Sequence, residues 1–79
     1  MMEDILSTAL DTVGELLEDV EFSIDNGFYT VRDNQEDTEV SVTEAIFMER
    51  TRHLVDENYD AIDAINLFQI GVLGTVVYG

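Results

Sequence analysis

The side chains of this chain that could do chemistry are mainly carboxylates. Eighteen Asp and Glu residues stand against three Arg, one His and no Lys, so the formal net charge is -15 over 79 residues. Self-repulsion of this size opposes a compact chain. A fold that retains it is therefore expected to use its negative field on a positively charged partner.

The first acidic group lies in an N-terminal stretch with helical periodicity. Asp4, Asp11, Glu15 and Glu18 fall on one side of that helix, and Asp19 and Glu21 follow. At a rise of about 1.5 Å per residue, Asp11 and Glu15 are about 6 Å apart and Asp4 and Asp11 about 10 Å apart. Duplex DNA carries one charge per about 1.7 Å of axis, counting both strands, and the separations on the helix are of the same order as the distances between neighbouring phosphates. Carboxylates held at this spacing can imitate a polynucleotide backbone.

Two more acidic groups follow along the chain, and the three together form the predicted partner-binding surface. The second group lies in a polar loop, which Glu39 continues, and the third precedes the C-terminal apolar segment. The predicted partner-binding residues are Asp4, Asp11, Glu15, Glu18, Asp19, Asp33, Glu36, Asp37, Asp56, Glu57, Asp60 and Asp63. The alternative is that they are ordinary solvated faces. Solubility alone does not explain the complete absence of Lys.

Catalysis is not expected of these residues. The single histidine, His53, follows Arg50-Thr51-Arg52, and the chain has no serine elbow or glycine-rich loop to supply a nucleophile beside it. We interpret His53 as a surface helix residue. A pair of carboxylates acting as acid and base needs a cleft, for which so small a domain has little room. We predict that the protein is not an enzyme.

Metal ions, cofactors and nucleic acids are not predicted ligands either. The acidic stretch 33–39 lacks the glycine of a calcium-binding loop, and Asp25-Asn26-Gly27 is better interpreted as a hairpin turn. The chain contains no cysteine, which excludes disulfides and thiolate metal sites. Three Arg residues cannot supply the basic surface that direct DNA or RNA binding requires.

The chain carries no recognisable targeting signal or membrane span. Its start, Met1-Met2-Glu3-Asp4, is acidic and lacks the basic region of a secretory signal, so we expect a cytoplasmic protein. The uncharged stretch 64–79 is shorter than the roughly 20 apolar residues that a transmembrane helix needs. The negative charge would also repel the molecule from anionic membrane surfaces.

The first half of the chain predicts a helix and antiparallel strands. Hydrophobic residues make up 46% of the chain, which is enough for a folded core. Apolar residues recur at helical spacing over residues 2–20. Two β-rich runs, 21–25 and 28–32, flank Asn26-Gly27, the preferred pair for a tight hairpin turn. The alternating stretch 38–42 predicts a third strand.

The second half predicts one or two helices. Ser41 and Glu44 match a capping box, and Asn58 offers a break before helical spacing resumes at residues 61–69. Residues 70–79 are compatible with either strand or helix. We expect one α+β domain over residues 1–79, with an N-terminal helix, an antiparallel β-hairpin or three-stranded sheet, and one or two C-terminal helices.

The uncharged segment 66–79 suggests two roles. It either forms a homodimer interface, because two-fold pairing commonly covers such a surface, or completes the core of the monomer.

In size, charge and α/β composition the chain resembles the small acidic DNA-mimic inhibitors that bacteriophages encode to block host DNA-binding proteins. The resemblance implies a phage protein of host takeover that acts in the bacterial cytoplasm through protein–protein interaction. It implies a target such as an HU-like nucleoid protein, whose nucleic-acid groove the mimic would occupy, and two copies would present about twice the acidic surface. The alternative function is an antitoxin, immunity protein or chaperone that binds a basic partner through its apolar C-terminal segment.

Overall fold

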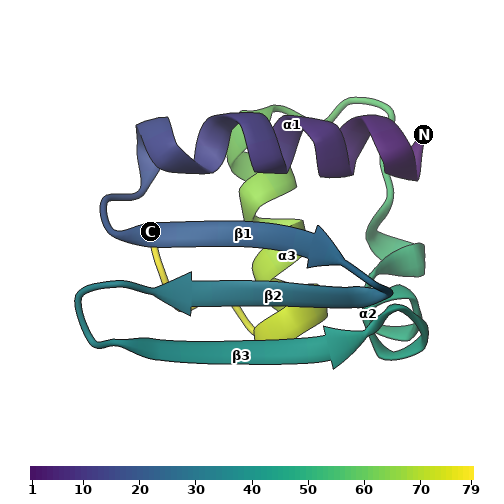
Figure 1. Ribbon diagram of the computed structural model, residues 1–79. Coiled ribbons are helices and arrows are strands. Elements are labelled where there is room, and N and C mark those ends of the chain that lie inside the picture. The colour runs from purple at the N-terminus through teal and green to yellow at the C-terminus, as the bar shows by residue number, and fades with distance from the viewer.

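The computed structural model describes residues 1–79 and has the α+β arrangement expected from the sequence. In chain order the elements are α1 (Met2–Leu16), β1 (Val20–Asp25), β2 (Phe28–Asp33), β3 (Thr38–Thr43), α2 (Glu44–Thr51), a short 3-10 turn η1 (Arg52–Leu54) and α3 (Ala61–Leu73). The strands form one sheet in the order β1-β2-β3; α3 crosses behind it, and α1 runs along the outer side of β1 (Figure 1).

The sheet is an antiparallel meander whose first turn is the one predicted. Asn26 and Gly27 have φ values of 51° and 79°, as a type I′ hairpin turn requires, and they place Asp25 opposite Phe28. The second turn brings Asp33 opposite Thr38. All three predicted strands are confirmed, and each is longer than expected by one residue.

Helix α1 ends before its predicted boundary at residue 20. Leu17 is extended and Asp19 has a φ of 62°, so the chain reverses and Val20 becomes the first residue of β1. Val20 is buried. Its position fits the apolar stripe of a continued helix and equally the inward face of a strand, so either structure would bury it. Apolar spacing alone could not separate the two.

The predicted capping box at Ser41 is wrong. Ser41 remains in β3, where its hydroxyl lies 2.7 Å from that of Thr30 on β2. The N-cap of α2 is Thr43, whose Oγ1 accepts a hydrogen bond from the Ile46 N–H. Strand pairing continues until Thr43 lies opposite Phe28, which delays the start of the helix by two residues.

The C-terminal helices are two separate elements. After η1 the chain is irregular until Asp60, whose side chain accepts from the Asp63 N–H in a capping box that starts α3. Gly74, with a φ of 85°, ends α3 in the left-handed conformation. Arg50 of α2 donates to the carbonyls of Gly71 and Val72, placing a positive charge at the negative end of the helix.

The last residues are neither helix nor strand but are fixed to α3 by Gln69. Its buried amide donates to the Tyr78 carbonyl and accepts from the N–H groups of Val77 and Tyr78, at 2.8–2.9 Å. These three bonds satisfy a polar side chain that would otherwise be costly to bury.

The core lies between the sheet, α1 and α3. Phe22 stacks on Phe68 with ring centroids 4.4 Å apart, and Tyr29 stacks on Phe47 at 4.3 Å. Much of the segment 66–79 contributes to this core, because Leu67, Phe68, Gln69, Gly71 and Val72 are all buried. Val76 and Val77 remain exposed. A dimer through this segment stays a prediction, with little apolar surface left to form it.

No helix here has the length and apolar character needed to cross a bilayer.

Candidate functional site

Almost all carboxylates of this protein lie on its surface. Seventeen of the eighteen Asp and Glu residues are exposed, and Asp33 is the exception. Eleven of the twelve predicted partner-binding residues are therefore accessible to a partner.

Very little of this charge is neutralised within the molecule. The two ion pairs both involve Arg32, with Asp37 at 2.7 Å and Glu39 at 3.8 Å. Arg50 is occupied by the carbonyls at the end of α3, and Arg52 forms no ion pair. The carboxylates of α1 and of residues 56–63 consequently form no ion pair.

The fold brings the third acidic group beside the first. The segment between η1 and α3 passes behind α1 (Figure 1), and the Tyr59 hydroxyl lies 3.3 Å from that of Thr8 on α1. A cavity of about 290 Å³ between the two is lined by Ile5 of α1 and by Asp56 and Asp63. Residues 56–63 thus extend the acidic surface of α1 around its N-terminal half.

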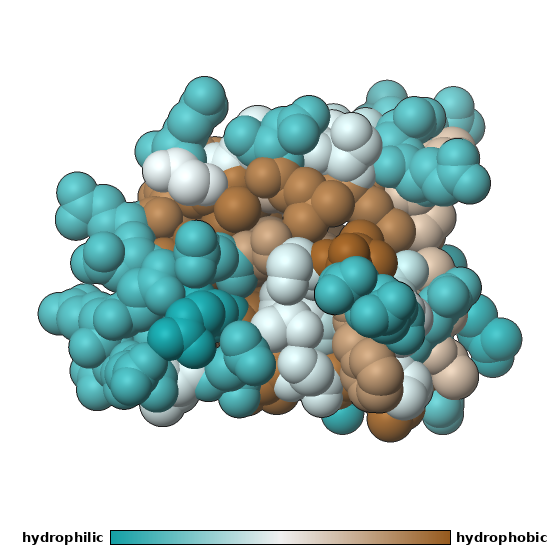
Figure 2. Space-filling view, viewed as in Figure 1, coloured by the Kyte–Doolittle hydropathy of each residue, from teal (hydrophilic) through white to brown (hydrophobic).

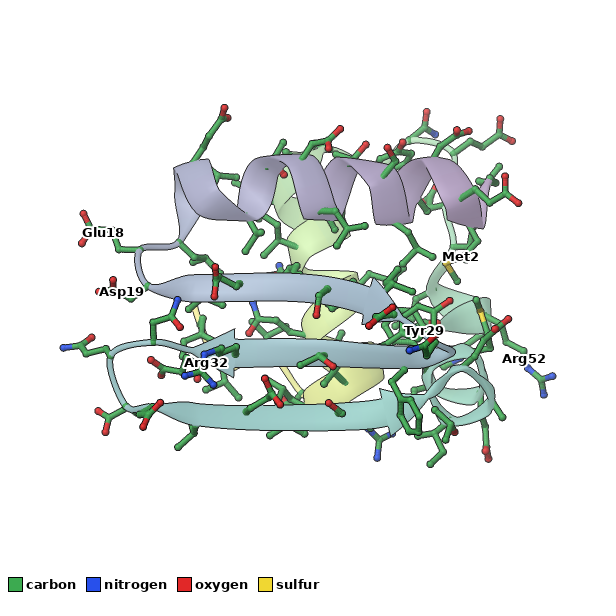
Figure 3. All side chains as sticks on the ribbon, in the orientation of Figure 1. Met2, Glu18, Asp19, Tyr29, Arg32 and Arg52 are labelled. Atoms are coloured by element: carbon green, nitrogen blue, oxygen red, sulfur yellow. The ribbon has the colours of Figure 1, made fainter.

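The second acidic group lies at the other end of α1. The Asn34 N–H donates to the Asp19 carbonyl at 2.7 Å, and the Asn34 side chain donates to Glu21 at 3.0 Å. Figure 3 shows Glu18, Asp19 and Arg32 at this same end of the molecule. The turn carrying Glu36 and Asp37 therefore continues the acidic surface from the end of α1.

Together these contacts define an acidic band that runs from residues 56–63 along α1 to the β2–β3 turn. Figure 2 shows hydrophilic side chains along the outer edge of α1 and at this end of the sheet, a strip of hydrophobic side chains where α1 meets β1, and a paler patch over the middle of the sheet. Asp25, Glu44 and Glu49 belong to α2 and the far end of the hairpin, where the Glu44 N–H donates to the Gly27 carbonyl. We call these three residues the hairpin-end group.

Asp33 does not belong to the acidic band, which corrects its prediction as a partner-binding residue. Only 8% of it is exposed, and its carboxylate accepts from the backbone N–H groups of Gln35 and Glu36 and from the Tyr78 hydroxyl, at 2.9–3.1 Å. The Glu36 N–H, followed by the Tyr78 hydroxyl, lowers the pKa of Asp33. The same hydrogen bond raises the pKa of Tyr78. Asp33 fastens the β2–β3 turn and the C-terminal residues to each other.

The single histidine takes no part in these contacts. His53 is exposed in η1 and forms no hydrogen bond or ion pair. No three His, Asp or Glu side chains are grouped to hold a metal ion. A second cavity, of about 180 Å³, lies between the end of α1, α3 and the last residues of the chain, and its lining includes Leu16, Ile62 and Tyr78.

Comparison with protein families, with curated proteins and with solved structures finds no match to this chain.

Proposed function

We propose that this protein inhibits a basic DNA-binding protein by occupying its nucleic-acid groove in place of DNA. The observation that carries the proposal is the acidic band, in which exposed carboxylates of three chain segments adjoin and, except for Asp37, form no ion pair. A polyanion of this kind attracts the Lys and Arg residues that line such a groove.

The band is fixed in shape, which a competitor of DNA requires. Helix α1 is fastened to the core by Ile5, Leu6, Ala9 and Val13, so the carboxylates on its outer side keep their spacing. The partner need not order a flexible acidic tail, and the entropy cost of binding is correspondingly smaller. Long-range attraction should make association fast and sensitive to salt.

An HU-like nucleoid protein is the first target to test, following the resemblance to phage-encoded DNA mimics. The protein would then act in the bacterial cytoplasm during host takeover. The rival function, an antitoxin, immunity or chaperone protein, uses the apolar C-terminal segment instead. Val76 and Val77 are the exposed apolar residues there, with 42% and 59% of their surface accessible.

The test is displacement of labelled duplex DNA from an HU-like protein, followed by fluorescence anisotropy. We expect the protein to release the DNA, and its own affinity for the HU-like protein to fall steeply between about 50 mM and about 200 mM salt. An affinity that does not change with salt would favour the rival, because apolar contacts are little affected by screening.

Two matched variants separate a shaped mimic from a mere polyanion. D11N/E15Q/E18Q and D25N/E44Q/E49Q each remove three carboxylates, the first set from the acidic band and the second from the hairpin-end group. We expect the first variant to lose about tenfold in affinity, at about 0.5 kcal/mol per exposed charge, and the second to lose much less. Equal losses would contradict a groove-shaped surface.

A further inference from the structure

Strand β3 forms an open edge of the sheet. Five of its six residues are exposed and the sixth, Val42, is half-buried. Figure 1 shows no element beyond β3, whereas α1 lies along the opposite edge at β1. The unpaired side of β3 is therefore available for another strand.

The pairing pattern identifies the backbone groups that are free. The Glu44 N–H donates to the Gly27 carbonyl. In an antiparallel pair every second residue bonds to the neighbouring strand, so Thr38, Val40 and Val42 are the residues of β3 that bond to β2. The N–H and C=O groups of Glu39 and Ser41 consequently point away from the sheet, as does the N–H of Thr43, whose C=O accepts the first hydrogen bond of α2 as its N-cap.

This edge has few of the devices that usually protect one. The chain contains no proline, the register of β3 on β2 is unbroken from Thr38 to Thr43, and Glu39 is the one charged residue of the strand. The charge of Glu39 is partly offset by Arg32 on β2, at 3.8 Å.

We propose that β3 pairs antiparallel with β3 of a second copy of this chain, about a two-fold axis at Ser41. In that register the free groups of Glu39 meet those of Thr43 of the second copy, and Ser41 meets Ser41. These three pairs form about four hydrogen bonds, because the Thr43 carbonyl of each copy is already bonded within its own α2. A shift of the axis to Val40 leaves two such pairs, and a shift to Glu39 places two carboxylates opposite each other.

The side chains of the strand are self-complementary in the same register. On the inward face, Val40 meets Val42 of the second copy, covering a valine that is 42% exposed in the monomer. On the outward face, the Thr43 hydroxyl can donate to Glu39 of the second copy, because its oxygen already accepts from Ile46. Assembly ends at two copies, since pairing consumes both β3 edges and α1 flanks both β1 edges.

Salt should act on this dimer in the opposite sense to its effect on the proposed inhibitory complex. Each copy carries a net charge of -15, so two copies repel and screening favours their pairing. The dimer does not depend on the proposed function, and either can fail alone.

Sedimentation velocity over a range of protein and salt concentrations tests the proposal. We expect the wild type to shift from 8.9 kDa toward twice that mass as either concentration rises. Ser41→Pro should stay monomeric, because it removes an outward N–H without breaking a backbone bond to β2, and edge strands tolerate proline there. The control S41T keeps the N–H and should dimerise as the wild type does.

A second variant decides the outcome if S41P proves unfolded by circular dichroism. Val40→Lys places a charged chain on the inward face of the new pairing, and should prevent it even though it lowers the repulsion between copies. A wild type that stays at 8.9 kDa in high salt would overturn the proposal. So would a dimer that persists in both folded variants, or one abolished by Val77→Asp instead, which would assign the interface to residues 66–79.

Discussion

Asp33 and Asp37 lie four residues apart and have opposite roles. Asp33 is buried and accepts three hydrogen bonds, whereas the Asp37 side chain is 84% exposed and faces the Arg32 guanidinium. The sequence predicted both as partner-binding residues because both lie in one polar acidic stretch. Extending the inward alternation of Tyr29 and Val31 by one step would have placed Asp33 inside. Its partner Tyr78 gave no signal, because their contact spans 45 positions.

The Asp33–Tyr78 hydrogen bond predicts how stability depends on pH. The pKa of Asp33 is lowered by folding, so its stabilising effect is present above about pH 4 and is lost as the pH falls through the folded pKa. The raised pKa of Tyr78 contributes stability that is present below about pH 10 and lost as the pH rises through the folded value.

Tyr78→Phe should therefore lower the Tm by a few degrees at pH 7. The difference from the wild type should shrink below about pH 4, as Asp33 becomes protonated in both proteins. Thermal melts followed by circular dichroism from pH 2 to pH 7 would measure it. Tyr59→Phe is the control, because its hydroxyl meets Thr8 and no carboxylate. A Y78F deficit that is constant over this range would contradict the role given to Asp33.

At the scale of elements, the sequence predicted correctly a turn that depends on two adjacent residues. It misplaced the helix boundaries that depend on packing. The Asn26-Gly27 hairpin follows from two residues that accept positive φ, and the structure confirms it. The end of α1 and the start of α2 depend instead on where strand pairing begins and ends. Val20 and Ser41 each satisfied a helical pattern but lie in strands. The Asp60 cap and the Arg50 contact with the end of α3 were likewise not predicted.

Two glycines within helices have opposite surroundings, so replacing them by alanine should have opposite effects on stability. A Cβ at Gly71 of α3 would collide with the Phe47 ring, whereas a Cβ at Gly14 of α1 would meet no atom. Gly71→Ala should destabilise the protein by about 1–3 kcal/mol through overpacking. Gly14→Ala should stabilise it by about 1 kcal/mol through helix propensity.

Urea unfolding of both variants measures these changes under the same conditions. The stacking of Tyr29 on Phe47 makes displacement of the ring costly, so G71A should also alter the near-ultraviolet circular dichroism of the folded state. A G71A protein as stable as G14A would show that the contact between α2 and α3 is looser than described.

For the molecule as a whole, composition indicated a charged surface but not its shape. The sequence separates residues 4–19 from 56–63 by most of the chain, and only the packing of α3 and its preceding segment against α1 brings them together. The residues of the three acidic groups were predicted individually. Which groups adjoin on the surface could be known only from the fold. The separate hairpin-end group of Asp25, Glu44 and Glu49 was not distinguished by sequence.

The uncompensated charge should make folding stability rise with salt. With a net charge of -15 and two ion pairs, screening relieves more repulsion than attraction. We expect the Tm to increase between about 0.01 M and about 1 M NaCl, over which the screening length falls from about 30 Å to about 3 Å. The increase should be steepest at the low end, where this length falls from about 30 Å to about 10 Å. D25N/E44Q/E49Q should show a smaller increase, and a Tm that falls with salt would contradict the prediction.

The three tyrosines occupy three different parts of the molecule, and the chain has no tryptophan. Tyr29 reports on the aromatic core, Tyr59 on the contact with α1, and Tyr78 on the C-terminal residues. The protein thus contains its own optical probes, since its near-ultraviolet absorbance and emission come from these rings apart from the weak bands of its four phenylalanines. Single Tyr→Phe replacements would divide an unfolding trace into three local signals, and their coincidence would establish whether the domain melts as one cooperative unit.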